Sequence, residues 1–175
     1  RWMKNCCPCV EIRAILRRTM LSDFKIRSFR CFEHLEIPTL RRLNLITGKN
    51  GTGKTTLLEA LRVYACDGSP DDLMAMLDAR GESDETSPVD ALATMFGVST
   101  TPHDWAKKTC FLGSAERPLH LKMRWHQQDR KTKGWTETSE RTGSEALLVV
   151  QGPDEERVRV DWANLRNPTS AWMPL

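Results

Sequence analysis

A glycine-rich loop near residue 50 carries the residue types that bind phosphate. Residues 48–55 read GKNGTGKT and match the P-loop pattern G-x-x-x-x-G-K-[ST] at every position. The glycines let the backbone turn its N–H groups inward, because glycine reaches positive φ without steric cost. We expect the Lys54 ammonium to lie between the β- and γ-phosphates of a nucleotide. The Thr55 hydroxyl is expected to reach Mg²⁺.

The residues on either side of the loop predict the elements that a P-loop requires. Residues 43–47 (LNLIT) are predicted to form a buried strand, and residues 54 to about 65 a helix. The free N–H groups and the positive dipole end of this helix would add to anion binding. Its buried stripe is predicted from apolar residues at helical spacing, namely Leu57, Leu58, Leu61, Tyr64 and Ala65. A chance match in a glycine-rich turn is the alternative, and these flanks disfavour it.

The loop and the residues ahead of it resemble a known class of ATPase. With Asn50 and a second threonine at Thr56, the string G-x-N-G-x-G-K-T-T-L resembles the Walker A motif of ABC-type ATPases. Residues 26–32 follow the pattern I-x-x-F-R-x-F. Together with the loop they make residues 21–61 similar to the N-terminus of the RecF/SMC/OLD-like ATPases, which are often described as AAA family ATPases with an AAA-type core.

The resemblance implies an ATPase that couples ATP binding and hydrolysis to DNA repair, chromosome maintenance or anti-phage defence. It implies ATP and Mg²⁺ as ligands, a homodimer of ATPase heads, DNA or a partner nuclease as further partners, and a cytoplasmic location. Only the resemblance favours ATP over GTP. The nucleotide-binding residues that it carries over are Gly48, Asn50, Gly51, Gly53, Lys54, Thr55 and Thr56, with Thr55 reaching Mg²⁺ through the nucleotide.

One arginine of the first strand lies near the nucleotide in some relatives. In this chain it would be Arg27 or Arg30. A solvated arginine on an edge strand remains the alternative for both.

The acidic groups that such an ATPase needs for catalysis have no clear counterpart. The apolar run at residues 147–150 is followed by acids only at residues 154–156, whereas a Walker B acid stands at the tip of its strand. A turn at residues 152–154 between strands over 146–151 and 157–162 is therefore predicted. No copy of the L-S-x-G-like signature is evident either, so the catalytic residues stay unassigned.

Two further motifs have simpler interpretations. Residues 78–81 fit the D-x-x-G pattern of GTPases, but no N-K-x-D motif follows, and a helix that stops at Gly81 is preferred. Gln127, Gln128 and Gln151 are candidates for the Q-loop glutamine of the family. For each of them a surface position is the preferred interpretation.

The expected fold is α/β, a P-loop NTPase of ABC/SMC type whose N-terminal lobe has antiparallel strands beside the P-loop strand and helix. Residues 20–175 are expected to be the N-terminal part of an ATPase domain, interrupted before the signature and Walker B. Residues 1–19 are basic and rich in cysteine and precede Met20. They lack the apolar run of a signal peptide, so we expect a non-native or disordered extension.

The remaining pattern predicts a hairpin, two short helices and several strands. In the hairpin, Phe24, Ile26 and Ser28 are expected on one face and Lys25, Arg27 and Phe29 on the other. Helices are predicted over 71–79, with Ser69 and Pro70 at its start, and over 89–96. The strands form an antiparallel meander over 119–126, 135–140, 146–151 and 157–162, with His120 and His126 in phase on its solvated face.

Composition limits the other functions. The 175 residues have a net charge of +3, which is too small to predict DNA binding by itself. A basic stretch could contact a phosphate backbone, although a solvated hairpin loop is the simpler interpretation; it comprises Lys122, Arg124, Trp125, Arg130, Lys131, Lys133 and Trp135. No apolar run reaches the roughly 18 residues of a membrane span.

The cysteines are read mainly as reduced thiols. Cys6, Cys7 and Cys9 form a cluster without a matching second pair of ligands, so metal binding is disfavoured. The isolated Cys31, Cys66 and Cys110 are expected to be partly buried thiols.

Three functions remain open. The first is the ATP-binding part of a RecF/SMC/OLD-like ATPase. The second is a catalytically incomplete, nucleotide-responsive adaptor for DNA or protein. The third, a subunit of an ABC transporter, is disfavoured by the hairpin that precedes the loop.

Overall fold

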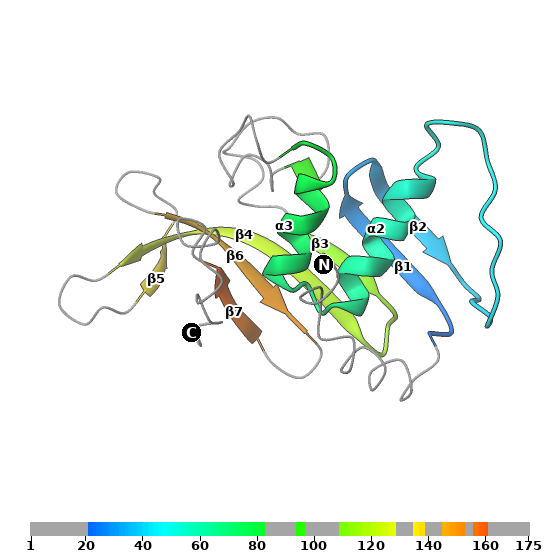
Figure 1. The fold of residues 1–175 in the computed structure, drawn as a ribbon. Helices are drawn as coiled ribbons and strands as arrows, with labels where there is room; N and C mark the ends of the chain where they lie inside the picture. Colours follow the sequence, from blue (N-terminus) through cyan, green and yellow to red (C-terminus); the bar gives the residue numbers. More distant parts are fainter. Residues whose placement is uncertain are drawn as a thin grey trace, which may run out of the picture.

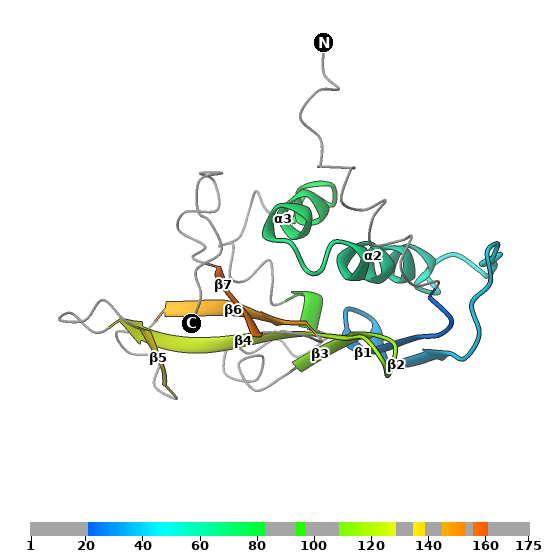
Figure 2. The ribbon, with the colours of Figure 1, turned by 90° about the horizontal axis from the view of Figure 1, so that it is seen from below.

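Among the residues that the structure describes, seven strands hydrogen-bond into one antiparallel sheet, and two helices cover one of its faces (Figures 1 and 2). The computed structural model describes residues 21–82, 94–96, 109–128, 135–138, 145–152 and 156–160. The predicted α/β class and the antiparallel strands are therefore present.

The sheet has the order β2-β1-β3-β4-β6-β7, and β5 pairs with β4 beside β3. Its strands are β1 (Phe24–Phe29), β2 (Phe32–Ile37), β3 (Thr109–Gly113), β4 (Pro118–Gln128), β5 (Trp135–Thr138), β6 (Glu145–Gln151) and β7 (Glu156–Val160). The predicted meander is wrong in one pairing, because β6 pairs with β4 and not with β5. Strand β4 has 11 residues, long enough for β3 and β5 to share one of its edges. Strand β3 was not predicted.

The β1–β2 hairpin forms as predicted, but its facing changes near the turn. Phe24 and Ile26 are fully buried, as expected for one face. Phe29 is also fully buried, although it was predicted to face the other way with Arg27. Ser28 has a φ of 52°, and this left-handed conformation breaks the alternation of the strand. The two-residue turn then begins at Arg30, which also has a positive φ of 49°.

The helix after the glycine loop, α2 (Lys54–Ala65), begins where predicted. Its buried stripe differs from the prediction, because Leu58 is 58% exposed. The residues that face the sheet are Thr56, Leu57, Ala60 and Val63. The prediction is confirmed for Leu57, and Leu61 and Tyr64 are partly buried against the core, but it is wrong for Leu58. It followed the large apolar residues and so missed the small Ala60.

The second helix, α3 (Pro70–Asp78), starts one residue earlier than predicted, with Ser69 at the cap position but without a side-chain capping bond. It ends at Asp78, and Gly81 follows with a φ of 69°. The helical stop at residues 78–81 is therefore confirmed. Of the predicted helix over 89–96, the structure describes a 3₁₀ turn, η1 (Thr94–Phe96).

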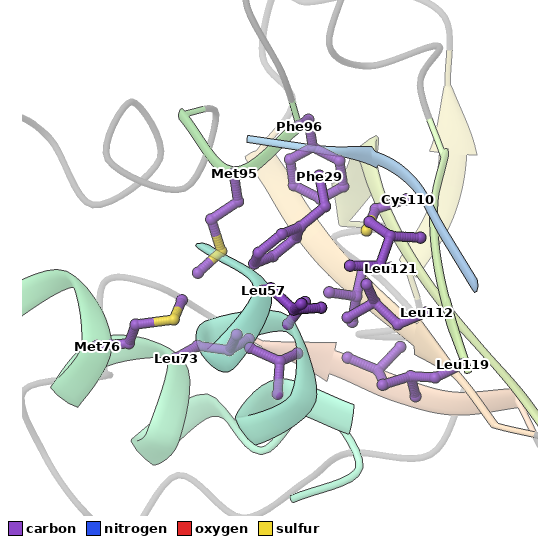
Figure 3. Packing of buried hydrophobic residues seen from close by; sticks show 14 of the residues in the cluster. Phe29, Leu57, Leu73, Met76, Met95, Phe96, Cys110, Leu112, Leu119 and Leu121 are labelled. Atoms are coloured by element: carbon purple, nitrogen blue, oxygen red, sulfur yellow. The ribbon is translucent and has the colours of Figure 1, made fainter. Parts of the chain in front are cut away.

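The core lies between the helices and the sheet (Figure 3). Helix α2 contributes Leu57, α3 contributes Leu73 and Met76, and η1 contributes Met95 and Phe96. Each large side chain fully buried there stabilises the fold by about 1.5–3 kcal/mol before entropy costs. On the sheet side the core includes Phe24, Ile26, Phe29, Cys110, Leu112, Leu119, Leu121 and Met123.

The predicted buried strand ahead of the glycine loop is absent. Residues 43–47 have no strand assignment, and Leu43 and Leu45 are 90% and 88% exposed. A buried strand needs hydrogen-bonding neighbours, and no strand of the described residues pairs with this segment. Locally, Asn44 instead closes a turn, since its side chain accepts from Arg41 N at 3.0 Å and donates to Arg41 O at 2.7 Å.

Several predictions fall outside the described residues. They concern the extension at 1–19 with its cysteine cluster, the helical residues 89–93, and Arg130, Lys131 and Lys133. Among the described cysteines all are free thiols, with Cys31 exposed, Cys66 intermediate and Cys110 buried. The described helices are all too short or too polar to cross a membrane.

Candidate nucleotide-binding site

The glycine-rich segment curls into a loop that leads directly into α2. Gly51 and Gly53 have φ values of 79° and 87°, in the left-handed region that favours glycine. The Thr52 hydroxyl donates to Lys49 O at 2.9 Å and so closes the loop on itself. The side chains of residues 48–52 are exposed, which leaves the loop open to a ligand.

The N-terminus of α2 has an open set of backbone donors. Gly53 occupies the cap position and offers no side chain to cap the helix. The first helical bond runs from Leu57 N to Gly53 O at 2.9 Å, so the N–H groups of residues 54–56 precede it. The first turn has no acidic residue to neutralise the positive end of the helix dipole. This geometry favours an anion at the start of α2.

The Lys54 ammonium lies across the loop. Its Nζ donates to Gly48 O at 2.9 Å and to Lys49 O at 2.6 Å. Carbonyl oxygens carry only partial charge, so these bonds position the ammonium without neutralising it. The positive charge and the open helix terminus therefore lie at the same loop.

Thr55 and Thr56 lie on different sides of α2. Thr55 is exposed in the first helical turn, whereas Thr56 is 7% exposed and belongs to the stripe that faces the sheet. An exposed hydroxyl beside the loop is what a magnesium ligand of a bound nucleotide requires. Asn50 is at the exposed turn of the loop.

The β1–β2 turn lies against the C-terminal end of the loop. A Cβ atom placed on Gly53 would lie 2.7 Å from Phe32 Cζ and 3.1 Å from Cys31 Sγ. No real Cβ contact is as short as the first of these distances, so Gly53 is required by space as well as by its φ. The sequence motif predicted the glycine, but not the neighbour that excludes a side chain.

The two candidate arginines of the first strand have other surroundings. Arg27 is exposed on the sheet face away from α2, with its guanidinium Cζ 6.0 Å from the centre of the Phe111 ring. This agrees with the solvated alternative, but the expected edge strand is wrong, because β1 pairs with β2 on one side and β3 on the other. Arg30 has an 8% exposed side chain and forms ion pairs with Glu59 and Glu82. Sequence reasoning missed these pairs, which join residues far apart in the chain.

The described residues do not supply a catalytic acid. The apolar run that was considered for Walker B lies in β6, which pairs antiparallel with β7, and the predicted hairpin is thereby confirmed. No group of three or more His, Cys, Asp or Glu residues in the described ranges could hold a metal ion. Among the glutamine candidates, Gln151 accepts a hydrogen bond from Lys122 Nζ at 2.7 Å.

The two histidines of β4 differ in their surroundings. His126 is only 3% exposed, so its predicted solvation is wrong; β4 has strands on both sides at this position. His120 packs edge-on against Phe111 with the ring centres 5.3 Å apart. Burial, assisted by the charge of Lys122, lowers the pKa of His120.

Together, the glycine loop, the lysine that lies across it and the uncapped helix terminus have the features expected of a phosphate-binding loop. Comparison with known proteins agrees with this class. Residues 24–87 match a family described as "AAA domain".

Two curated relatives are both named "DNA replication and repair protein RecF". The protein from Saccharophagus degradans is 47% identical over 45 residues, and the one from Bacillus mycoides is 38% identical over 45 residues. Each match covers 26% of this chain and 12% of the relative. No solved structure matches the chain significantly. The predicted resemblance to the RecF/SMC-like P-loop ATPases is thus confirmed for the N-terminal segment.

Proposed function

We propose that residues 48–56 bind Mg·ATP, and that the chain is the ATP-binding part of an ATPase that acts in DNA replication or repair. The observation that carries the proposal is the Lys54 ammonium, held at the loop that opens onto the uncapped start of α2. The similarity to RecF supports both ATP and a role on DNA.

The roles follow from the geometry of the loop. Backbone N–H groups of the loop and of the first turn of α2 surround the phosphates, and Lys54 leaves the carbonyls of Gly48 and Lys49 to pair with the phosphate oxygens. The Thr55 hydroxyl would hold Mg²⁺, and the ion would supply positive charge to offset the phosphates. Gly51 and Gly53 keep the loop free of side chains that would displace the ligand.

Turnover needs groups that the described residues do not provide. An acid must orient the attacking water, and in this class a second ATPase head closes the site. We propose that this chain alone binds ATP with little or no hydrolysis, and that a homodimer of heads is the active form. A role in anti-phage defence, or with a partner nuclease, would be a variant of the same ATP cycle.

A nucleotide-responsive adaptor for DNA is the second candidate function. It is favoured by the face of the sheet that carries no helix, where Lys25 and Arg27 of β1 and Lys122 and Arg124 of β4 lie. Two of these four cations have an acidic neighbour: the Glu36 carboxylate pairs with Lys25 at 2.7 Å, and Glu137 lies 3.5 Å from Arg124. The cationic side chains would contact phosphates and not base edges.

The proposal is tested by nucleotide binding to the Thr55 variants. ATP should bind more tightly than ADP, and AMP should bind weakly, because affinity follows the number of phosphates in the loop. Magnesium should strengthen ATP binding in the wild type and in Thr55→Ser, which keeps the hydroxyl, but not in Thr55→Val. Equal affinity for AMP and ATP would overturn the proposal.

A further inference from the structure

A cluster of charged side chains joins α2, the helix that follows the glycine loop, to three other segments. Arg30 of the β1–β2 turn forms a paired contact with Glu82, from Nη1 to Oε1 at 3.0 Å and from Nη2 to Oε2 at 3.1 Å. Its Nε lies 3.0 Å from Oε2 of Glu59 in α2. The other oxygen of Glu59 accepts from Arg80 Nε at 2.6 Å, just beyond α3. Thr94 of η1 donates to Glu82 at 3.2 Å.

The contact between Arg30 and Glu59 is buried at the centre of this cluster. The side chains are 8% and 11% exposed, so each charge depends on its partners for compensation. The Nε and Oε2 atoms are close but are not aligned as a hydrogen bond. The carboxylate of Glu59 is therefore shared between two arginines, one on the hairpin and one after α3.

The hairpin turn contacts α2 at two places along its length. Near the N-terminus of the helix, Cys31 and Phe32 lie against Gly53. Within the helix, Arg30 holds Glu59, one and a half turns after Lys54. In addition, the backbone N–H of Arg30 donates to Met95 O at 2.8 Å and fixes the turn to η1. Because α2 is a rigid helix, these two contacts help to set its position along the sheet. The position of α2 in turn sets where the N–H groups at its start lie, and these are the groups proposed to bind phosphate.

We propose that Arg30 is a positioning residue for the phosphate loop, and that it acts through Glu59. The ion pair holds α2 in the place where Lys54 and the first-turn N–H groups converge on one ligand. Glu82 pairs with the other side of the Arg30 guanidinium, through Nη1 and Nη2. The proposal rests on nucleotide binding by the loop, as inferred above.

The test compares two carboxylates of the same cluster. Glu59→Gln and Glu82→Gln each remove one negative charge with little change of shape. Electrostatics alone would make both variants bind ATP more tightly, because a negative charge is removed near an anionic ligand. A positioning role predicts the opposite for Glu59→Gln, namely Mg·ATP binding weaker by about tenfold, with Glu82→Gln within about twofold of the wild type.

Calorimetric titration with Mg·ATP and urea unfolding are measured on the same full-length samples. Equal weakening of Mg·ATP binding in both variants, or unchanged binding in Glu59→Gln, would overturn the role of Arg30. The proposed function would still stand in that case, because the wild type binds Mg·ATP. Failure of the wild type to bind Mg·ATP would instead remove the proposed function itself, and this inference with it.

A double-mutant cycle shows whether Arg30 acts through Glu59. Arg30→Gln combined with Glu59→Gln should bind Mg·ATP about as well as Arg30→Gln alone, because the contact between Arg30 and Glu59 is already lost and the glutamine keeps an acceptor oxygen for Arg80 Nε. Losses that add fully would overturn the proposal. Arg30→Lys supplies the test if Arg30→Gln does not fold. A lysine keeps the charge but lacks the fork that reaches both carboxylates, so the expected affinity is several-fold lower than in the wild type.

Discussion

Phe32 occupies the space that a side chain on Gly53 would need. Its Cζ lies 2.7 Å from the position of a Cβ atom on that glycine, and Gly53 has a φ of 87°. The aromatic ring of the hairpin thus fixes the end of the glycine loop by contact. Gly51, in the same loop, also has a positive φ of 79°, but nothing lies within 4 Å of its Cβ position.

Gly53→Ala should therefore destabilise the protein more than Gly51→Ala. Both substitutions place alanine in the left-handed region, which costs about 1–2 kcal/mol. Only Gly53→Ala adds the collision with Phe32, which we expect to cost about 1–3 kcal/mol more. Urea unfolding of the two variants measures the difference directly.

The matched control for this comparison changes the ring instead of the glycine. Phe32→Leu shortens the side chain, so in that background Gly53→Ala should lose most of its extra cost and approach Gly51→Ala. Equal stability of the two alanine variants in the wild-type background would contradict the contact.

The segment ahead of the loop should contribute little to stability. Leu43 and Leu45 are almost fully exposed. Replacement of either by serine is expected to change the free energy of unfolding by less than about 0.5 kcal/mol. Ile26→Ala, in the buried face of β1, should cost about 2–5 kcal/mol. Strong destabilisation by Leu45→Ser would mean that this segment is packed in a strand after all.

His120 should make the fold less stable in mild acid. Its pKa is lowered from the ordinary value of 6.5, first by burial and then by Lys122. The unfolded chain then binds the proton more readily, so stability is full above about pH 6.5 and falls as the pH decreases through the folded-state pKa. Urea unfolding between pH 7.5 and about pH 5 should show this loss, weakened in His120→Gln.

The control for the histidine is His34→Gln, at an exposed position of β2. Because this variant keeps His120 and its surroundings, the contribution of His120 to the acid loss should persist in it. Glu36 has a lowered pKa because of its contact with Lys25, so its effect appears only below its ordinary value of 4.5 and does not overlap this window. An identical pH profile in the wild type and His120→Gln would refute the assignment.

Arg27 should contribute to DNA binding if the helix-free face contacts phosphates. Each phosphate contact adds about −0.9 to the slope of log affinity against log salt concentration. Arg27→Gln should reduce the size of that slope by nearly this amount for any duplex sequence. Arg62→Gln is the control, because Arg62 lies on α2 and pairs with Asp72 at 3.1 Å. The same slope for wild type and Arg27→Gln would exclude Arg27 from the DNA contact.

The features that sequence predicted well are local ones. The loop and the start of α2 depend on consecutive residues whose types fix the backbone, such as Gly53 followed by Lys54. The stop at Gly81 and the hairpin between β6 and β7 depend likewise on short turn signals.

The features that sequence missed depend on residues far apart in the chain. The burial of Ala60 in place of Leu58 is decided by how α2 sits on the sheet, and the buried His126 lies where β5 and β6 both pair with β4. The pairing of Arg30 with Glu82 joins residues 52 positions apart, and no local pattern predicts such a contact.

The most direct test of the account is the titration of Mg·ATP into wild type, Lys54→Ala and Lys49→Ala. Both variants lose one positive charge from the same loop, but Lys54 alone supplies the ammonium that lies across it. The account predicts that Lys54→Ala abolishes measurable binding, whereas Lys49→Ala binds within several-fold of the wild type. Equal binding by Lys54→Ala and wild type, with both chains folded, would contradict the claim that this loop is a nucleotide site.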